Sequence, residues 1–138
     1  MRFMMLVIPK GYEMAEPGTM PDPKAIDAMT KYNESLHNAG VLLALDGLHP
    51  PSMGARVSFS GGKPAVTDGP FAEAKEVLGG YWMIQVKSRE EAIEWAKRAP
   101  MGDNEIIEIR QVQEIEDFEP SEAIEREAAL LDVLNANR

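Results

Sequence analysis

The stretch Thr67-Asp68-Gly69-Pro70-Phe71-Ala72-Glu73-Ala74-Lys75-Glu76, followed two residues later by Gly79-Gly80-Tyr81-Trp82, joins two strand-like segments of this 138-residue chain. Asp, Gly and Pro in succession are typical of a turn, because they supply the side-chain hydrogen bonds and backbone conformations that turns require. Residues 72–77 predict one or two helical turns directly after this corner. The sequence on either side then predicts which elements the corner connects.

A β-hairpin is predicted just before the corner. Residues 56–59 alternate between polar and apolar side chains, and the chain returns over residues 64–67. Between them, Ser60-Gly61-Gly62-Lys63 is typical of a tight turn, since adjacent glycines adopt positive φ angles without strain. Pro64 has no N–H group to donate and therefore favours an edge strand.

The segment after the corner predicts a strand, a helix and another strand. Residues 81–86 are rich in aromatic and β-branched side chains, which favour strands. One alternating set should face a core and the other a more mixed environment; these are Trp82, Ile84 and Val86, and Tyr81, Met83 and Gln85, respectively. Ser88 and Glu91 form a capping box that starts a helix, Pro100 ends it, and residues 106–112 predict the last strand.

The N-terminal third of the chain predicts a strand, a helix and a second strand. Residues 3–8 form a continuous apolar run, typical of a strand that is buried on both faces. Asp22-Pro23 is a helix start, because the carboxylate can cap free N–H groups and Pro at the first helical position loses no hydrogen bond. Gly40 ends this helix. Residues 41–45 form the second apolar strand, closed by a loop over residues 46–51.

This order of elements predicts an α+β fold of the ferredoxin-like type, a split β-α-β arrangement with both helices on one face of a mainly antiparallel sheet. The other sheet face would then be bare, although two of its strands are apolar on both sides. At about 25 cal/mol per Å² of apolar surface, leaving that face in water would be a large cost. We therefore expect a homodimer, docked sheet to sheet as a dimeric α/β-barrel.

The expected domain spans residues 1–113, and residues 114–138 form an acidic linker and an extra C-terminal helix. Apolar residues recur in that helix at spacings of three and four, which makes its apolar stripe wide. They are Ile124, Ala128, Leu131 and Leu134, with Ala123, Leu130 and Val133 beside them. Such a stripe needs a surface to pack on, either in the domain or in its dimer partner.

Composition excludes several classes of function. The net charge of -9 and the absence of any Lys/Arg cluster argue against nucleic acid as a partner. There is no cysteine and only two histidines, and no phosphate-binding or dinucleotide fingerprint is present, so we expect no metal and no cofactor. The apolar N-terminal run is far shorter than the about 20 residues that span a bilayer, so we expect no membrane association and a cytoplasmic location.

The corner sequence Asp68-Gly69-Pro70-Phe71, in its setting from Thr67 to Glu76, resembles the signature of the DGPF-domain branch of the YCII-related (YciI-like) family. Residues 39–42, the Asp46-Gly47-Leu48 segment and residues 91–96 also match that branch. The resemblance covers about residues 1–113. It implies a homodimer of ferredoxin-like subunits, in agreement with the expectation from the bare sheet face.

The resemblance implies less about function. The YciI branch is associated with a His-Asp pair in a pocket, and a dehydrochlorinase is among its relatives. Its histidine lies near the start of the first helix, where this chain reads Asp22-Pro23-Lys24-Ala25-Ile26 without a histidine, so that pair is not carried over. The DGPF branch is also linked by gene fusion or neighbourhood to extracytoplasmic-function sigma factors, which implies a regulatory context.

Three residues are candidates for acid-base catalysis: Asp68, Asp46 and His49. A carboxylate beside a pocket can act as a general base, and a His-Asp pair can shuttle protons near neutral pH. The alternative for Asp68 is an Asx-turn, in which its side chain accepts backbone N–H groups, and for Asp46 it is ordinary turn chemistry. Candidates for ligand binding in the same cavity are Tyr81, Arg56, Phe71 and Glu73.

Two classes of function follow. The first is a cofactor-independent lyase or isomerase that moves protons on a small organic compound with these carboxylates and His49. The second is a non-catalytic, ligand- or partner-binding dimer with a regulatory role.

Overall fold

Residues 1–137 are described by a computed structural model; Arg138, the last residue of the expected C-terminal segment, lies outside them. The central sheet has four strands in the order β2-β5-β1-β6, and every neighbouring pair is antiparallel. The strands are β1 (Arg2–Ile8), β2 (Leu42–Gly47), β5 (Gly80–Gln85) and β6 (Ile106–Gln111). This order is that of the predicted ferredoxin-like fold.

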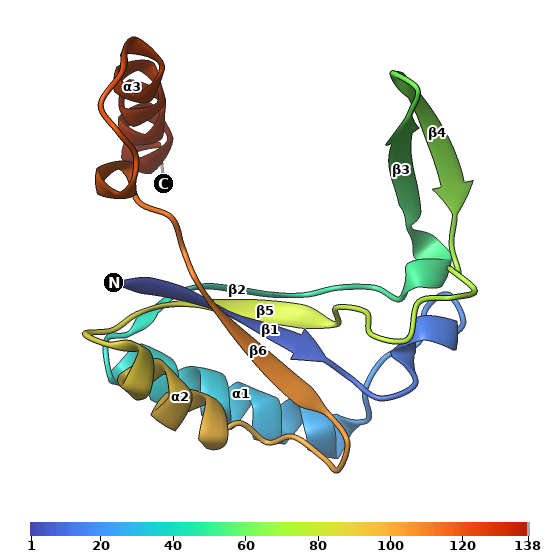
Figure 1. The fold of residues 1–138 in the computed structure, drawn as a ribbon. Coiled ribbons are helices and arrows are strands. Elements are labelled where there is room, and N and C mark those ends of the chain that lie inside the picture. Colours follow the sequence, from blue (N-terminus) through green and yellow to red (C-terminus); the bar gives the residue numbers. More distant parts are fainter. Residues whose placement is uncertain (138) are drawn as a thin grey trace.

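Two helices, α1 (Pro23–Asn38) and α2 (Arg89–Lys97), cover the same face of the sheet (Figure 1). Their ends form as predicted. Asp22 caps α1 by accepting a 2.8 Å hydrogen bond from Ala25 N–H, and Gly40 follows the helix at φ 74°. Ser88 caps α2 by accepting from Glu91 N–H, while the Glu91 carboxylate accepts from the preceding Lys87 N–H. Local capping therefore sets where both helices begin.

The hydrophobic core lies between these helices and the sheet. Phe3, Met5, Leu36 and Ile84 are at most 2% exposed. The rings of Tyr32 and Trp82 meet edge to face with centroids 5.2 Å apart, and both polar ends are satisfied, since Tyr32 O–H donates to Trp95 O and Trp82 Nε1 donates to Asn33 Oδ1. Burial raises the pKa of Tyr32 to about 12. The core thus joins α1, α2 and β5 through packing and two hydrogen bonds.

Among residues 1–137 no helix lies over the opposite face of the sheet, which is apolar along β1 and β5 but carries Glu108 and Arg110 on β6. Because successive side chains of a strand point to opposite faces, the residues next to each core residue in sequence point away from α1 and α2. Met4 lies opposite Met83, and Leu6 lies opposite Tyr81, all of them half-buried, and Ile106 at the edge is 45% exposed. The run over residues 3–8 is therefore covered on one face only within this chain. We call Met4, Leu6, Ile8, Tyr81, Met83 and Ile106 the open sheet face.

Strand β2 differs from its prediction. It runs from Leu42 to Gly47, so Asp46 and Gly47 belong to the strand and not to the following loop, and it forms an edge of the sheet. A register irregularity between Leu42 and Ala44 interrupts its pairing with β5. The sequence Asp46-Gly47 predicts a turn, but these two residues pair with Tyr81 and Gly80, so the strand continues through Gly47.

The predicted hairpin forms as a separate two-stranded sheet, β3 (Ala55–Ser60) and β4 (Lys63–Asp68), which projects from the body of the molecule (Figure 1). Its turn contains Gly61 and Gly62 at φ 58° and 78°, as the adjacent glycines predicted. Every residue of both strands is exposed. Nothing in residues 1–137 buries either face of this hairpin.

The segment after the corner does not form the predicted helical turns. A single hydrogen bond from Ala74 N–H to Phe71 O closes one turn, and residues 74–79 are irregular. Val77 is buried (8% exposed) and holds this segment against the body. This burial outweighs the helix propensity of the segment. Gly69 sits against the 3-10 turn at Pro51–Met53, where a Cβ atom would lie 1.7 Å from the Pro51 carbonyl oxygen. Only glycine fits at that position.

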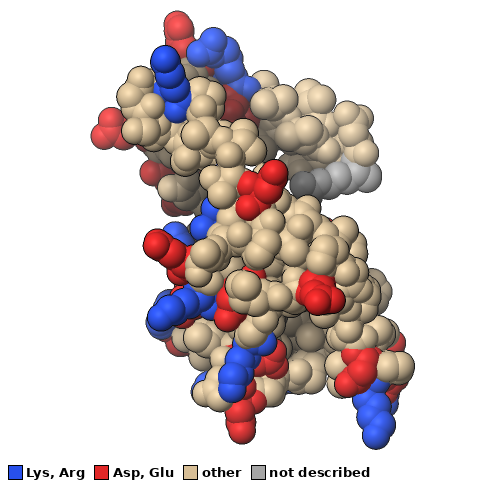
Figure 2. All heavy atoms as spheres, turned by 90° about the vertical axis from the view of Figure 1, so that its right-hand side faces the viewer, with Lys and Arg blue, Asp and Glu red and all other residues tan. Residues whose placement is uncertain are grey.

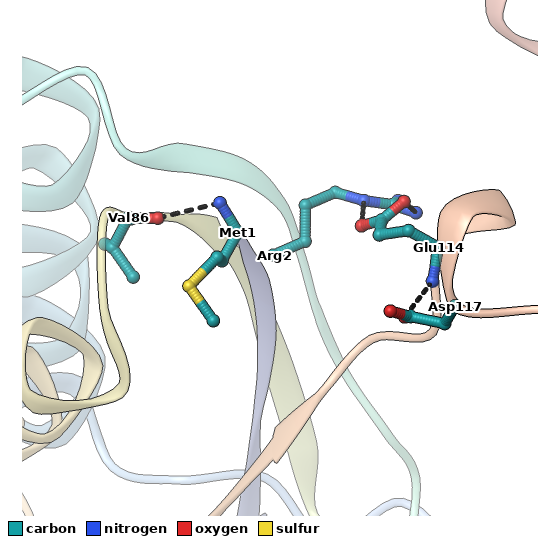
Figure 3. A network of polar contacts seen from close by, with 5 residues as sticks. All are labelled: Met1, Arg2, Val86, Glu114 and Asp117. Atoms are coloured by element: carbon teal, nitrogen blue, oxygen red, sulfur yellow. Dashed lines mark hydrogen bonds and ion pairs between the residues drawn. The ribbon is translucent and has the colours of Figure 1, made fainter.

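The C-terminal segment is anchored to the start of β1 (Figure 3). Arg2 Nε and Nη2 donate to the two carboxylate oxygens of Glu114 at 2.7 and 2.9 Å, and Glu114 N–H donates to Asp117 Oδ2. The Arg2 guanidinium lowers the pKa of Glu114, since it donates hydrogen bonds to the ionised carboxylate. This clamp fixes the 3-10 turn Ile115–Asp117 at the edge of the open sheet face.

Beyond the clamp, α3 (Glu122–Ala136) stands away from the sheet, on the side opposite α1 and α2 (Figure 1). Ser121 caps it by accepting from Ile124 N–H. None of its described residues is buried, and Leu130, Val133 and Leu134 are each at least 50% exposed. The helix is therefore formed as predicted without a packing surface in this chain. Within residues 1–137, none of the helices has the length and apolar composition that a membrane crossing needs.

The Arg2–Glu114 clamp predicts a pH-dependent contribution to stability. Because the pKa of Glu114 is lowered by folding, the contribution is fully present above about pH 5 and is lost as the pH falls through the folded pKa, which lies below 4.5. Both side chains are about one-third exposed, so screening limits it to about 1 kcal/mol. Urea unfolding of Glu114→Gln should show this loss at neutral pH, with the difference from the wild type shrinking in acid.

The matched control is Glu116→Gln, which removes an exposed carboxylate from the same 3-10 turn. It should leave the pH dependence of unfolding unchanged. Equal pH profiles for the wild type, Glu114→Gln and Glu116→Gln would contradict the role of the clamp.

Candidate functional site

Two open hollows lie at the base of the β3–β4 hairpin. The first, of about 700 Å³, is lined by the polar face of the hairpin and the segment after the corner. Arg56, Phe71 and Glu73, three of the four predicted ligand-binding residues, line it together. The guanidinium carbon of Arg56 lies 4.1 Å from the centre of the Phe71 ring, within the range of a cation–π contact. The corner thus places the Phe71 ring against the guanidinium of Arg56.

The second hollow, of about 600 Å³, is lined mainly by apolar residues of the loops around the 3-10 turn Pro51–Met53. His49 lines it, together with Arg56, Phe71 and Glu76. Since Arg56, Phe71 and Glu76 border both hollows, these three side chains form the wall between them. Apolar residues that contribute to the second hollow include Leu48, Met53, Val77 and Leu78.

Arg56 is the one Lys or Arg side chain among the described residues that line these hollows. Its charge is opposed by Glu73 and Glu76, so the region has no strong excess of either sign. Figure 2 shows the same pattern on the side that carries the hairpin, where acidic and basic side chains lie scattered among uncharged residues. The hollows therefore suit a small, mostly apolar molecule with one group for Arg56 better than a highly charged one.

Asp46 and Tyr81 form a separate pair on the open side of the sheet. They are cross-strand partners, and Tyr81 O–H donates to Asp46 Oδ2 at 2.6 Å. This hydrogen bond, with further effects of desolvation and of the Asp46 charge, raises the pKa of Tyr81. Asp46 thus lies in β2 and accepts a hydrogen bond from the phenol of Tyr81 in β5, whereas the alternative from the sequence placed it in a turn. Neither residue lines either of the two hollows, of which the second contains His49.

Asp68 is the last residue of β4 and is exposed. It pairs with Ala55, which places it on the hairpin face opposite Arg56 and Thr67. Among the described residues its carboxylate has neither the backbone N–H donors of an Asx-turn nor a place in either hollow. In the isolated chain, the three predicted catalytic residues Asp68, Asp46 and His49 therefore lie in three different settings.

Glu76 is the residue at this site that the sequence did not single out. It lies within residues 72–77, which predict helical turns, and because these turns do not form, its side chain borders both hollows. No local pattern marks it, since its place depends on the irregular path of residues 74–79. Within residues 1–137, no three His, Asp or Glu side chains cluster closely enough to hold a metal ion.

The side chains at this site offer a small set of acid-base and binding groups. His49 offers an imidazole, Arg56 can hold an acidic or carbonyl group of a ligand, and Phe71 offers a ring face. The Asp46–Tyr81 pair offers a carboxylate and a phenol at the end of the open sheet face.

The fold and these hollows define a ferredoxin-like α+β domain with an added hairpin and helix. The chain belongs to the YCII-related domain family, whose sequence profile matches residues 1–116. The matched region contains the whole four-stranded sheet, both packed helices and the hairpin. Helix α3 lies outside it.

The chain is similar to an uncharacterised protein, R00369, of Rhizobium meliloti (strain 1021). It is 33% identical to this chain over 76 residues, which is 55% of this chain and 61% of the relative. The chain therefore spans less than two thirds of that relative's length, and the relative carries no assigned activity.

The Asp46–Tyr81 hydrogen bond predicts a measurable titration. Asp46→Asn removes the negative charge beside the phenol, so one of the three tyrosines should ionise at a lower pH in an ultraviolet absorbance titration. Tyr81→Phe should remove that transition and so identify it. Asp103→Asn, which neutralises an exposed carboxylate in the loop before β6, is the control and should titrate as the wild type does. An unchanged profile in Asp46→Asn would contradict the pairing.

Proposed function

We propose that this protein is a homodimer that binds a small organic molecule at the base of the β3–β4 hairpin. The dimer is formed by two copies whose open sheet faces pack on each other. The support for it is the apolar character of Met4, Leu6, Ile8 and Met83, which α1 and α2 leave uncovered. At about 25 cal/mol per Å² of apolar area removed from water, packing these side chains against a second sheet is strongly favourable.

The ligand that these hollows favour is small and mostly apolar, with one acidic or carbonyl group. The observation that carries this proposal is the Arg56 guanidinium held 4.1 Å over the Phe71 ring in the wall between two hollows. A guanidinium supported in this way is pre-organised for a carboxylate, enolate or carbonyl oxygen. The apolar residues of the second hollow would contact the rest of the molecule.

The reaction class that fits this site is proton transfer without a cofactor, as in a lyase or isomerase. The imidazole of His49, which lines the second hollow, would act as the acid-base group, and Arg56 would stabilise negative charge that develops on the ligand. Asp46, Tyr81 and Asp68 would take part only if dimer formation brings them toward the same ligand.

A non-catalytic, regulatory ligand-binding role is the second proposal. It is favoured by one observation: in a single chain, neither predicted carboxylate, Asp46 or Asp68, shares a hollow with His49. A link to extracytoplasmic-function sigma factors, implied by the resemblance to the DGPF branch, would suit this role, as would a cytoplasmic location.

Membership of the DGPF branch is itself a proposal, supported by the roles of the motif residues. Gly69 fits against the Pro51 carbonyl, where no other residue can be accommodated, and Phe71 supplies the ring under Arg56. The motif would then be a structural marker that shapes the site, with Asp68 as its exposed first residue.

A ligand screen with matched variants tests the proposed function. Small aromatic acids and lactones should be screened by thermal shift against the wild type, Arg56→Gln and Lys63→Gln. Arg56→Gln should weaken binding of an acidic ligand about tenfold or more, because it removes a charge-assisted contact. Lys63→Gln removes a cation from the same hairpin, at a position outside both hollows, and should bind as the wild type does.

Turnover of any compound that binds then separates the two roles. In an enzyme, His49→Gln should abolish turnover while binding persists. Binding without turnover in the wild type would favour the regulatory role. Equal weakening by Arg56→Gln and Lys63→Gln, or no ligand from the screen, would overturn the site at the hairpin base.

A further inference from the structure

Three charged side chains at the base of the hairpin are available to a ligand. Arg56, Glu73 and Glu76 line the first hollow together, and all three are exposed. Although they are of opposite sign, they form no ion pair with one another, and the ion pairs found within residues 1–137 join other side chains. The Arg56 guanidinium is held against the Phe71 ring instead. One cation and two carboxylates therefore face the same hollow without neutralising each other directly.

The wall between the two hollows brings three kinds of surface to one place. It is formed by Arg56, Phe71 and Glu76, which border both hollows. On one side of it lies the first hollow, to which Glu73 adds a second carboxylate. On the other side lies the second hollow, which is lined mainly by apolar residues. A ligand at this wall would meet a cation, a carboxylate and apolar surface at once.

These charges distinguish between classes of ligand. A simple anion is attracted by Arg56 but repelled by Glu73 and Glu76, and a simple cation meets the reverse. A zwitterion, which carries an anionic and a cationic group, is attracted by both kinds of side chain. An α-amino acid holds its carboxylate, its ammonium group and its side chain on one carbon atom, so the three groups can meet the cation, the carboxylates and the apolar surface of this wall together.

We propose that Glu73 and Glu76 make this site selective for a zwitterion, namely an α-amino acid with an apolar side chain. Arg56 binds its carboxylate, Glu76 and Glu73 bind its ammonium group, and its side chain enters the second hollow. This inference rests on the ligand site proposed above, and it adds a cationic group to the acidic group assigned to the ligand there. A zwitterion has no net charge, in agreement with the mixed charges of the region.

The two carboxylates would also exclude other ligands. A dicarboxylate brings a second negative charge, and Arg56 is the one Lys or Arg side chain among the described residues that line the hollows, so this charge would face Glu73 and Glu76. Removal of either carboxylate should therefore have opposite effects on two kinds of ligand. It should lower the preference for an ammonium group and strengthen the binding of a dicarboxylate.

Three matched compounds test this selectivity by calorimetric titration at neutral pH. L-phenylalanine, 3-phenylpropanoate and benzylsuccinate share a benzyl group and a carboxylate, and the carbon between these groups carries an ammonium group, a hydrogen atom or a second acidic arm, respectively. The wild type should bind L-phenylalanine about threefold or more tightly than 3-phenylpropanoate, and benzylsuccinate most weakly. Glu73→Gln and Glu76→Gln should each reduce that preference and tighten benzylsuccinate binding. Glu34→Gln, which removes an exposed carboxylate of α1 outside both hollows, should behave as the wild type does.

The remaining outcomes separate this inference from the ligand site on which it rests. If the wild type binds 3-phenylpropanoate as tightly as L-phenylalanine, and Arg56→Gln weakens both, the selectivity is overturned while the site at the hairpin base stands. A preference for L-phenylalanine that persists when Glu73 and Glu76 are both changed to Gln also overturns the inference alone. If none of the three compounds binds, the inference is overturned, and the wider screen of acids and lactones decides the site by itself.

Discussion

The two packed helices cover one face of the sheet and leave the apolar side chains of β1 and β5 on the other face uncovered within residues 1–137. On the covered face, Phe3, Met5 and Ile84 are buried under α1 and α2, and Tyr32 and Trp82 lock these elements through an edge-to-face contact and two satisfied hydrogen bonds. On the other face, Met4, Leu6 and Met83 come from the same strands and find no cover in the chain. The free energy lost by leaving that face in water is the constraint on which the proposed dimer, and with it the proposed ligand site, depends.

The proposed cover of that face by a second copy would also explain why other elements of the single chain are exposed. The exposed hairpin and the unburied helix α3 both lie on the open side of the sheet (Figure 1). The Arg2–Glu114 clamp holds the start of the C-terminal segment at the edge of the open sheet face, so the direction in which α3 leaves is set by a specific contact (Figure 3).

Most of the fold could be predicted from the sequence because its signals are local. The caps at Asp22 and Ser88, the Gly61-Gly62 turn and the alternation over residues 81–86 each mark an element that forms as expected. The errors arose where tertiary contacts outweigh local preference: pairing with Tyr81 carries β2 through the Asp46-Gly47 turn signal, and burial of Val77 replaces helical turns after the corner. At the site, Arg56, Phe71 and Glu73 line one hollow, whereas Tyr81, which was predicted to share a cavity with them, pairs with Asp46 instead. Glu76 was missed, and the separation of Asp68, Asp46 and His49 depends on hairpin direction, which no local pattern encodes.

The molar mass of the protein in solution tests most directly whether a second copy covers the open sheet face. Light scattering on the unmodified chain at micromolar concentration, at neutral pH and moderate salt, is sufficient. A homodimer gives twice the 15.2 kDa of one chain and keeps that mass on dilution through the micromolar range. A mass of 15.2 kDa throughout that range would mean that the apolar face is left in water, and the proposed dimer would be wrong.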